Sequence, residues 1–208
     1  MTDGLTQDPP RHLGMVVGGS LTQGVEVRLD TTASTEDVKV GTFVSIDGAR
    51  MRFFGVVTEV SLGASDPTLA TTPPDVSNPY IAQVVLGTSA YGTITVEPML
   101  TMGDPEDPTV ILDGPQPAKT VPAHFSQVAQ ASELDIEQVF GGEDKTRFWI
   151  GSPLDMEARL CLDLGEFVKR SNGVFGKSGT GKTFLTRLLL AGILQSDTAV
   201  NLVFDMQS

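Results

Sequence analysis

Short runs of apolar residues, many of them alternating with polar ones, fill the first hundred positions of the chain. At residues 25–30 valine or leucine alternates with a charged residue, which turns one face of a strand toward a core and the other toward water. Asp47-Gly48 separates two such runs with a hairpin-turn signal. The runs predict six strands, at residues 13–17, 24–29, 42–46, 51–60, 81–86 and 93–97. Six short strands with no strong helix between them predict a small, closed or nearly closed β-barrel over residues 12–100.

Proline marks the segments between and after these strands. Residues 62–79 contain four prolines and little to bury, which predicts a long loop, and the proline-rich residues 98–122 are typical of a connection between domains. Residues 123–140 favour a helix, with Ser132 and Asp135 as a capping signal and Gly141-Gly142 as its end. We therefore expect four parts: a polar tail at 1–11, the barrel at 12–100, a connector with one helix at 101–147, and a second domain at 148–208.

The pattern of the second domain alternates strand and helix. Residues 172–175 predict a short strand, residues 184–195 a helix that is apolar on most sides, and residues 200–204 another strand. A strand, helix and strand in this order form a βαβ unit, which implies a parallel sheet with a right-handed crossover. The predicted fold class is therefore a β-barrel followed by an α/β domain, with the helix buried between the sheet and another layer.

The eight residues between the first of these strands and the helix carry the chemistry. Their sequence, Gly-Lys-Ser-Gly-Thr-Gly-Lys-Thr at 176–183, matches the P-loop pattern G-x-x-x-x-G-K-[ST] at every fixed position. Glycines let the backbone curl so that successive amides surround an oxyanion, and the helix N-terminus adds its own amides to the same site. Lys182 supplies a cation for the β and γ phosphates as the catalytic residue, and the hydroxyl of Thr183 is placed to bind Mg²⁺. We expect ATP to be held by Ser178, Gly179, Thr180, Gly181, Lys182 and Thr183.

Hydrolysis requires groups beyond this loop. P-loop enzymes also use an acidic residue on a later strand, a group that positions the attacking water, and often an arginine from a neighbouring subunit. Asp205, at the end of the second predicted strand, is a candidate for the outer shell of the metal, and a turn residue is an equally good interpretation. The residues after Lys182 complete one helix and one strand, which do not close the sheet of such a domain. We therefore expect the N-terminal part of a longer ATPase.

Charge is distributed unevenly along the chain. The net charge is −12, but residues 1–144 hold 6 basic and 20 acidic residues, whereas residues 145–208 hold 8 and 6. Because the acidic first piece repels a nucleic-acid backbone, we expect any contact with DNA to come from the second piece. A single cysteine, Cys161, an N-terminus unlike a secretory signal and the lack of an apolar run near 20 residues indicate a soluble cytoplasmic protein.

Three groups of segments, in this order along the chain, resemble the HerA family of hexameric DNA translocases. The first group is similar to the family's small barrel, a fold shared with the N-terminal barrel of rotary ATP synthase subunits, and comprises residues 14–18, 40–44 and 55–60. The second is similar to the family's approach to its P-loop and comprises residues 150–151, 162–164 and 175–183. The third, residues 202–208, resembles the family's second-strand motif.

The resemblance implies a RecA/FtsK-like motor domain after the barrel. It further implies a homo-hexameric ring that uses ATP and Mg²⁺ to translocate along or unwind double-stranded DNA, in DNA-end processing or defence, often with a partner nuclease of the NurA type. In such relatives the barrel forms a collar on the ring and docks the partner. Two alternatives stay open from the sequence. One is a nucleotide-binding module that does not hydrolyse ATP and uses its barrel for docking, and the other is a related motor of conjugation or secretion.

Overall fold

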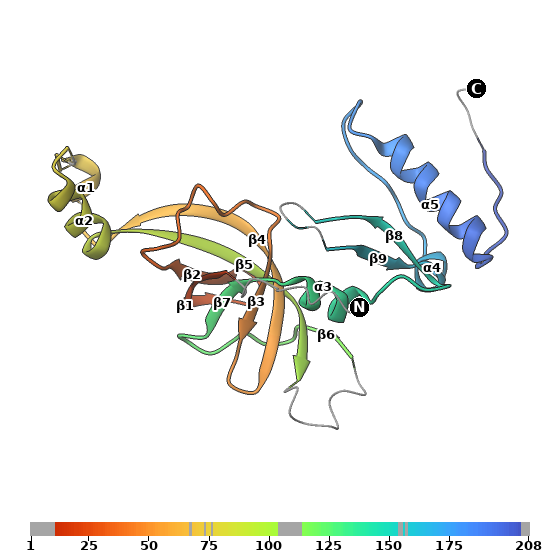
Figure 1. The fold of residues 1–208 in the computed structure, drawn as a ribbon, viewed down its shortest axis with the longest axis horizontal. Coiled ribbons are helices and arrows are strands. Elements are labelled where there is room, and N and C mark those ends of the chain that lie inside the picture. Colours follow the sequence, from red (N-terminus) through yellow and green to blue (C-terminus); the bar gives the residue numbers. More distant parts are fainter. Residues whose placement is uncertain are drawn as a thin grey trace, which may run out of the picture. The chain divides into compact units, whose positions relative to one another are not determined.

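The computed structural model describes residues 11–66, 68–72, 74–75, 77–103, 114–153, 156 and 158–204. The chain divides into two compact units, one ending at Ser132 and the other beginning at Glu133. Figure 1 shows the barrel strands of the first unit and the helices and short strands of the second. In the part of the chain that the structure describes, no helix is both long enough and apolar enough to cross a membrane.

Six antiparallel strands of the first unit close into a barrel. Neighbouring strands follow the order β2-β1-β7-β3-β4-β5, and an additional pairing of β2 with β5 joins the two ends of this series. The short strand β6 (Gln116–Pro117) is not part of this ring; among the described residues it pairs with β5 alone, at Leu100 and Thr101. The strands of the barrel are β1 (His12–Ser20), β2 (Gly24–Leu29), β3 (Phe43–Asp47), β4 (Met51–Ala64), β5 (Ala90–Gly103) and β7 (Gln127–Gln130). The predicted fold class, a six-stranded barrel followed by an α/β region, is confirmed.

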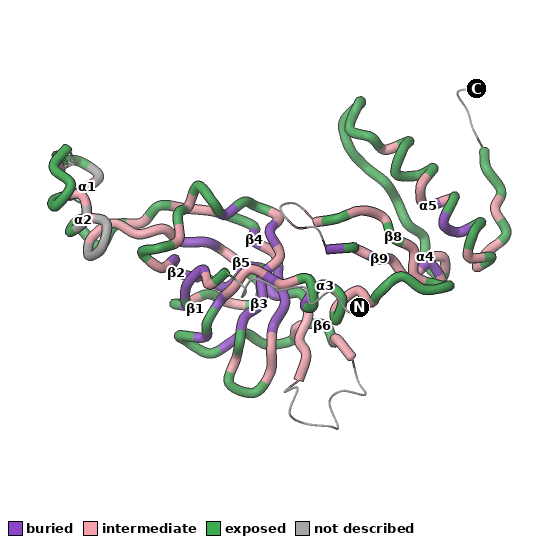
Figure 2. Tube along the Cα trace, viewed as in Figure 1, coloured by how far each residue is buried: buried purple, intermediate pink, exposed green. Residues whose placement is uncertain are grey.

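Alternating side chains from these strands fill the interior of the barrel. Along β2 every second side chain is buried, as the alternation of apolar and charged residues predicts. Figure 2 shows the buried positions gathered on the barrel strands. Gly14 of β1 lies so close to β2 that a Cβ atom there would stand 2.0 Å from the carbonyl oxygen of Arg28, so this crossing requires glycine. Side chains with no measurable exposure are those of Val27, Val44, Ile46, Val57, Val96 and Val128.

The predicted strand at residues 81–86 is wrong, because these residues are helical. They lie in α2 (Pro79–Thr88), which follows the one-turn helix α1 (Thr68–Thr71) at the end of the long β4–β5 hairpin. The side-chain oxygen of Asn78 caps α2 by accepting a hydrogen bond from the amide of Tyr80 at 3.0 Å, and Pro79 occupies the first helical position. A short apolar run is compatible with a strand or a helix, and here the Asn78 cap and Pro79 favour the helix. The predicted loop at residues 62–79 is corrected as well, since β4 continues to Ala64 and α1 follows it.

The sixth strand of the barrel comes instead from the segment expected to be helical. Residues 123–140 contain β7 and only then the helix α3 (Glu133–Phe140), which begins directly after Ser132 and ends before Gly141. Strand β7 pairs with β1, for example Gln127 with Met15, and with β3, where Val128 lies opposite Ile46. These partners lie far earlier in the sequence, so the local pattern around β7 does not show the pairing. Of the proline-rich segment at 98–122, residues 104–113 lie outside the described part of the chain.

The second unit contains a small hairpin and a long helix. Strands β8 (Arg147–Gly151) and β9 (Leu160–Asp163) pair antiparallel, and α4 (Leu164–Val168) follows directly. The predicted helix at 184–195 lies within α5 (Lys182–Ser196). Its buried residues are Leu189, Gly192 and Ile193, whereas Phe184 is 73% exposed, so the expectation of a helix buried on most sides is wrong.

Neither predicted strand beside α5 is present in the structure. Residues 172–175 and 200–204 are described without a strand and without pairing to each other. A strand pairs its backbone amides and carbonyls with those of a neighbouring strand. The apolar side chains here also lie open to solvent, with Phe175 93% and Phe204 84% exposed. The parallel βαβ sheet expected from the sequence is therefore not formed among the described residues.

The role of β7 in closing the barrel can be tested with asparagine substitutions at two neighbouring positions. Val128→Asn places a polar group on the fully buried face of β7, whereas Gln127→Asn changes a solvent-facing position. We expect Val128→Asn to lower the free energy of unfolding by about 3 kcal/mol, since it removes apolar burial and leaves an amide without partners. Gln127→Asn should change it by less than about 0.5 kcal/mol. Urea denaturation measures both, and equal effects of the two substitutions would contradict the strand.

Candidate functional site

The predicted phosphate loop curls immediately before α5. Residues 176–181 have no regular secondary structure, and the loop turns back on itself at residues 178–180. Two glycines enable this path, because Gly179 has a φ of 81° and Gly181 a φ of 86°, in the left-handed region that side chains disfavour. An ideal Cβ atom at either position would meet nothing within 4 Å, so the requirement for glycine is conformational and not steric.

One backbone carbonyl, that of Lys177, gathers three donors inside the loop. It accepts hydrogen bonds from the side-chain hydroxyl of Thr180 at 2.7 Å and from the ammonium nitrogen Nζ of Lys182 at 2.6 Å. The amide of Thr180 approaches the same oxygen at 3.4 Å. The ammonium group of Lys182 is thus folded back over the loop and held there by the backbone.

The N-terminus of α5 is open to an anion. Gly181 is the N-cap, and among the described residues no side chain caps the helix and no acidic residue lies in its first turn. Since the first amides of a helix have no partner within it, they point toward the loop side with the positive end of the helix dipole. Leu185 donates the first intrahelical hydrogen bond, to the carbonyl of Gly181 at 3.0 Å. These amides and one ammonium group fit a phosphate chain.

The structure brings the sequence-predicted residues together in one turn. Ser178, Gly179, Thr180 and Gly181 form the exposed loop, and Lys182 and Thr183 are the first two residues of α5. Asp205 lies outside the described residues. The sequence did not predict the hydrogen bond from the Thr180 hydroxyl to the carbonyl of Lys177, because the P-loop pattern allows any residue at these two positions.

A glycine inside α5 sets where the helix rests. A Cβ atom on Gly192 would lie 2.8 Å from the ring of Phe148 in β8 and 3.0 Å from the side chain of Leu164 in α4. The helix therefore lies against the β8–β9 hairpin at this point, and its N-terminal turn with the loop projects beyond the contact. A glycine in an otherwise apolar helix is the sequence signal that could have predicted this close packing.

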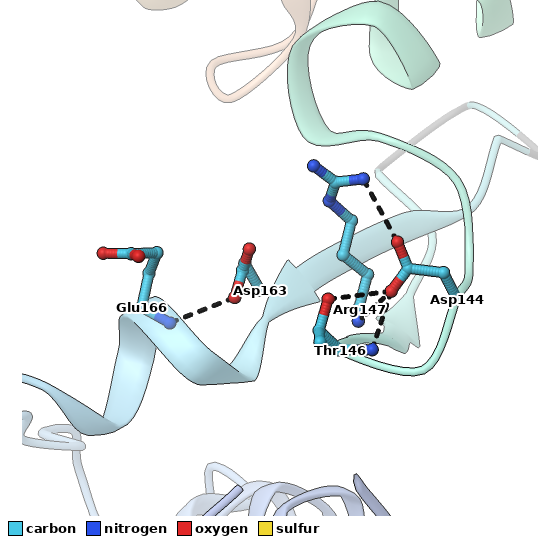
Figure 3. A network of polar contacts seen from close by, with 5 residues as sticks. All are labelled: Asp144, Thr146, Arg147, Asp163 and Glu166. Carbon is cyan, nitrogen blue, oxygen red and sulfur yellow. Dashed lines mark hydrogen bonds and ion pairs between the residues drawn. The ribbon is translucent and has the colours of Figure 1, made fainter.

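The hairpin beneath α5 is braced by a carboxylate. Asp144 accepts hydrogen bonds from the amide and hydroxyl of Thr146, at 2.7 and 2.9 Å, and from the amide of Arg147 at 2.7 Å (Figure 3). These bonds hold the pKa of Asp144 below its usual range, with the backbone bond from Thr146 as the largest cause. At the same end of the hairpin, where Arg147 lies opposite Asp163, the carboxylate of Asp163 caps α4 by accepting from the amide of Glu166 at 3.0 Å.

A cavity of about 460 Å³ lies between the hairpin and α5, but at the other end of that helix. It includes Gln195 and Ser196 of the last turn, together with charged residues of the segment 143–147. It contains none of the loop residues, so this cavity and the predicted phosphate loop are separate features.

Two protein families match the sequence. The family described as the HAS barrel domain matches residues 13–104, and the family described as the central domain of the helicase HerA matches residues 148–208. The first match covers strands β1 to β5, and the second begins inside β8 and includes the loop and α5. The chain matches none of the curated proteins with which it was compared.

The brace at Asp144 predicts a pH dependence. A carboxylate with a lowered pKa in the folded state contributes stability above the pKa of the unfolded chain, near pH 4, and loses it as the pH falls through the folded value. We expect the NMR titration midpoint of Asp144 to lie below that of an ordinary aspartate. The stability of Asp144→Asn should fall less steeply with acid than that of the wild type. An ordinary midpoint, with parallel acid profiles for the two proteins, would contradict the brace.

Proposed function

This chain belongs to the HerA helicase family, and we propose that it binds ATP with Mg²⁺ at residues 176–183 and uses ATP hydrolysis to move along or unwind double-stranded DNA. Membership of this family implies nucleotide binding. The observation that carries the finer proposal is the curled loop, in which an ammonium group and the open N-terminus of a helix converge on the same space.

Each residue of the loop has a proposed role. The amides of Ser178, Gly179, Thr180 and Gly181 surround the phosphates, and the helix dipole of α5 adds positive potential. Lys182, the catalytic residue of this proposal, turns from the carbonyl of Lys177 toward the β and γ phosphates. The hydroxyl of Thr183, exposed in the first turn of α5, binds the Mg²⁺ that accompanies the nucleotide and that neutralises charge on the phosphates during hydrolysis.

Charge supports the C-terminal segment, residues 145–208 of the second unit, as the part that meets DNA. Residues 145–208 carry 8 basic and 6 acidic residues, while residues 1–144 carry 6 and 20. A duplex attracts basic side chains through its phosphates, so the acidic barrel is the poorer surface for it. We propose that subunits of this chain form a homo-hexameric ring, as HerA proteins typically do, with DNA contacting the motor units and the barrels available to a partner such as a NurA-type nuclease.

The nucleotide site is tested by removing the ammonium group. Lys182→Ala should weaken the binding of ATP·Mg²⁺ by roughly tenfold to a hundredfold, since charge-assisted hydrogen bonds to phosphate contribute about 1.5–3 kcal/mol. The matched control is Lys145→Ala, which removes an exposed lysine of the same unit outside the loop and should leave affinity unchanged. Calorimetric titration of the two variants and the wild type measures this. Unchanged affinity in Lys182→Ala would exclude the site.

The DNA motor is tested by measuring ATP turnover with and without linear duplex DNA over a range of salt concentrations. We expect DNA to raise turnover several-fold at low salt and less as the salt concentration rises, because counterion release weakens binding to phosphates. Turnover that DNA never stimulates would favour a motor of conjugation or secretion. ATP binding without any turnover would favour a nucleotide-binding module.

A further inference from the structure

We propose that the side chain of Thr180 is a positioning residue for Lys182, acting through the carbonyl of Lys177. The inference rests on the proposed function, in which Thr180 contributes only its backbone amide to the phosphates. The hydroxyl of Thr180 points away from that role and toward the backbone three residues earlier, where it donates at 2.7 Å. The same oxygen accepts from the ammonium group of Lys182 at 2.6 Å.

Among the described residues, the backbone closes the same turn only through the longer contact of the Thr180 amide with the carbonyl of Lys177, at 3.4 Å. Residues 171–181 are all exposed, so no buried side chain holds the loop in shape. The three glycines of the motif, at positions 176, 179 and 181, give the backbone more freedom than other residues would. The hydroxyl bond of Thr180 closes the turn across residues 177–180 and restricts that freedom.

Closing the turn fixes the carbonyl of Lys177 as an acceptor at a defined place. A lysine side chain loses considerable rotamer entropy when it is held in one conformation, and an acceptor fixed beforehand reduces the reorganisation needed. Because the ammonium group already rests over the loop, it has only a short way to move when phosphates enter. Thr180 therefore sets the starting position of the cation on which nucleotide binding depends.

Gly176 provides an independent sign that the hydroxyl occupies a specific place. A Cβ atom on Gly176 would stand 2.8 Å from the hydroxyl oxygen of Thr180, while the side chain of Lys182 would be 3.7 Å away. The φ of Gly176 is outside the left-handed region, so the backbone itself would accept alanine. A side chain at the first glycine of the motif would therefore displace the hydroxyl from the carbonyl of Lys177.

Three single substitutions test the assignment. Thr180→Ala removes the hydroxyl, Thr180→Ser retains it, and Thr186→Ala is the matched control, since Thr186 also donates its hydroxyl to a backbone carbonyl, that of Lys182 at 2.9 Å within α5. The dissociation constants of ATP·Mg²⁺ and ADP·Mg²⁺ are measured by calorimetry on the full chain. Thermal unfolding of each variant reports whether the fold is retained.

We expect Thr180→Ala to weaken ATP binding about fivefold, which corresponds to about 1 kcal/mol, and to weaken ADP binding less, because ADP lacks the γ phosphate. Thr180→Ser should restore both affinities, and Thr186→Ala should leave them unchanged. If the hydroxyl only stabilised the fold, Thr180→Ala would lower the unfolding temperature and weaken the binding of both nucleotides equally. That result, or a failure of serine to restore binding, would overturn the assignment.

A double-mutant cycle with Gly176→Ala tests the same contact from the other side. Gly176→Ala should weaken ATP binding when Thr180 is present. It should have little further effect in combination with Thr180→Ala, because the hydroxyl with which the new methyl group clashes is then absent. Additive effects would overturn the assignment. Unchanged affinity in Thr180→Ala together with a large loss in Lys182→Ala would overturn this inference alone, whereas unchanged affinity in Lys182→Ala would contradict the proposed function itself.

Discussion

The function argued for this chain depends on a backbone that curls at two left-handed glycines and passes directly into a helix. Gly179 and Gly181 set the curl, and α5 begins at the next residue without a capping side chain among the described residues. The amides that open a helix have no partner within it, and the ammonium group of Lys182 lies over the loop that leads into α5. Neither an extended loop nor a helix capped by a side chain would leave this space available to phosphates.

The two units reach stability by different means. In the barrel every strand has two neighbours, because the pairing of β2 with β5 completes the ring, and alternate side chains meet in one core. In the second unit, buried residues are fewer, and α5 rests on the β8–β9 hairpin through Gly192. Apolar side chains around the loop, such as Phe175 and Phe184, remain exposed. The site is therefore formed mainly by local backbone geometry and local hydrogen bonds, with little help from a surrounding core.

The sequence predicted features that depend on interactions between nearby residues and missed those that depend on residues far apart in the chain. The sequence predicted the strands with clear alternation, such as β2, and the loop with its fixed glycines and lysine, because each of these signals lies within a few residues. Strand β7 was missed because its partners β1 and β3 are far away in the chain, and α2 was mistaken for a strand because its apolar run is ambiguous without the Asn78 cap. The contact between Thr180 and the carbonyl of Lys177 depends on the path of the backbone, which no residue pattern encodes.

In the proposed function, the amides at the turn into α5 receive the phosphates of ATP. Amide hydrogen exchange, resolved to single residues and measured with and without ATP·Mg²⁺, tests this placement. We expect slower exchange at residues 178–183 when nucleotide is present, with the amides of the barrel core unchanged. Exchange at residues 178–183 that does not respond to saturating nucleotide, or protection confined to another part of the chain, would contradict it.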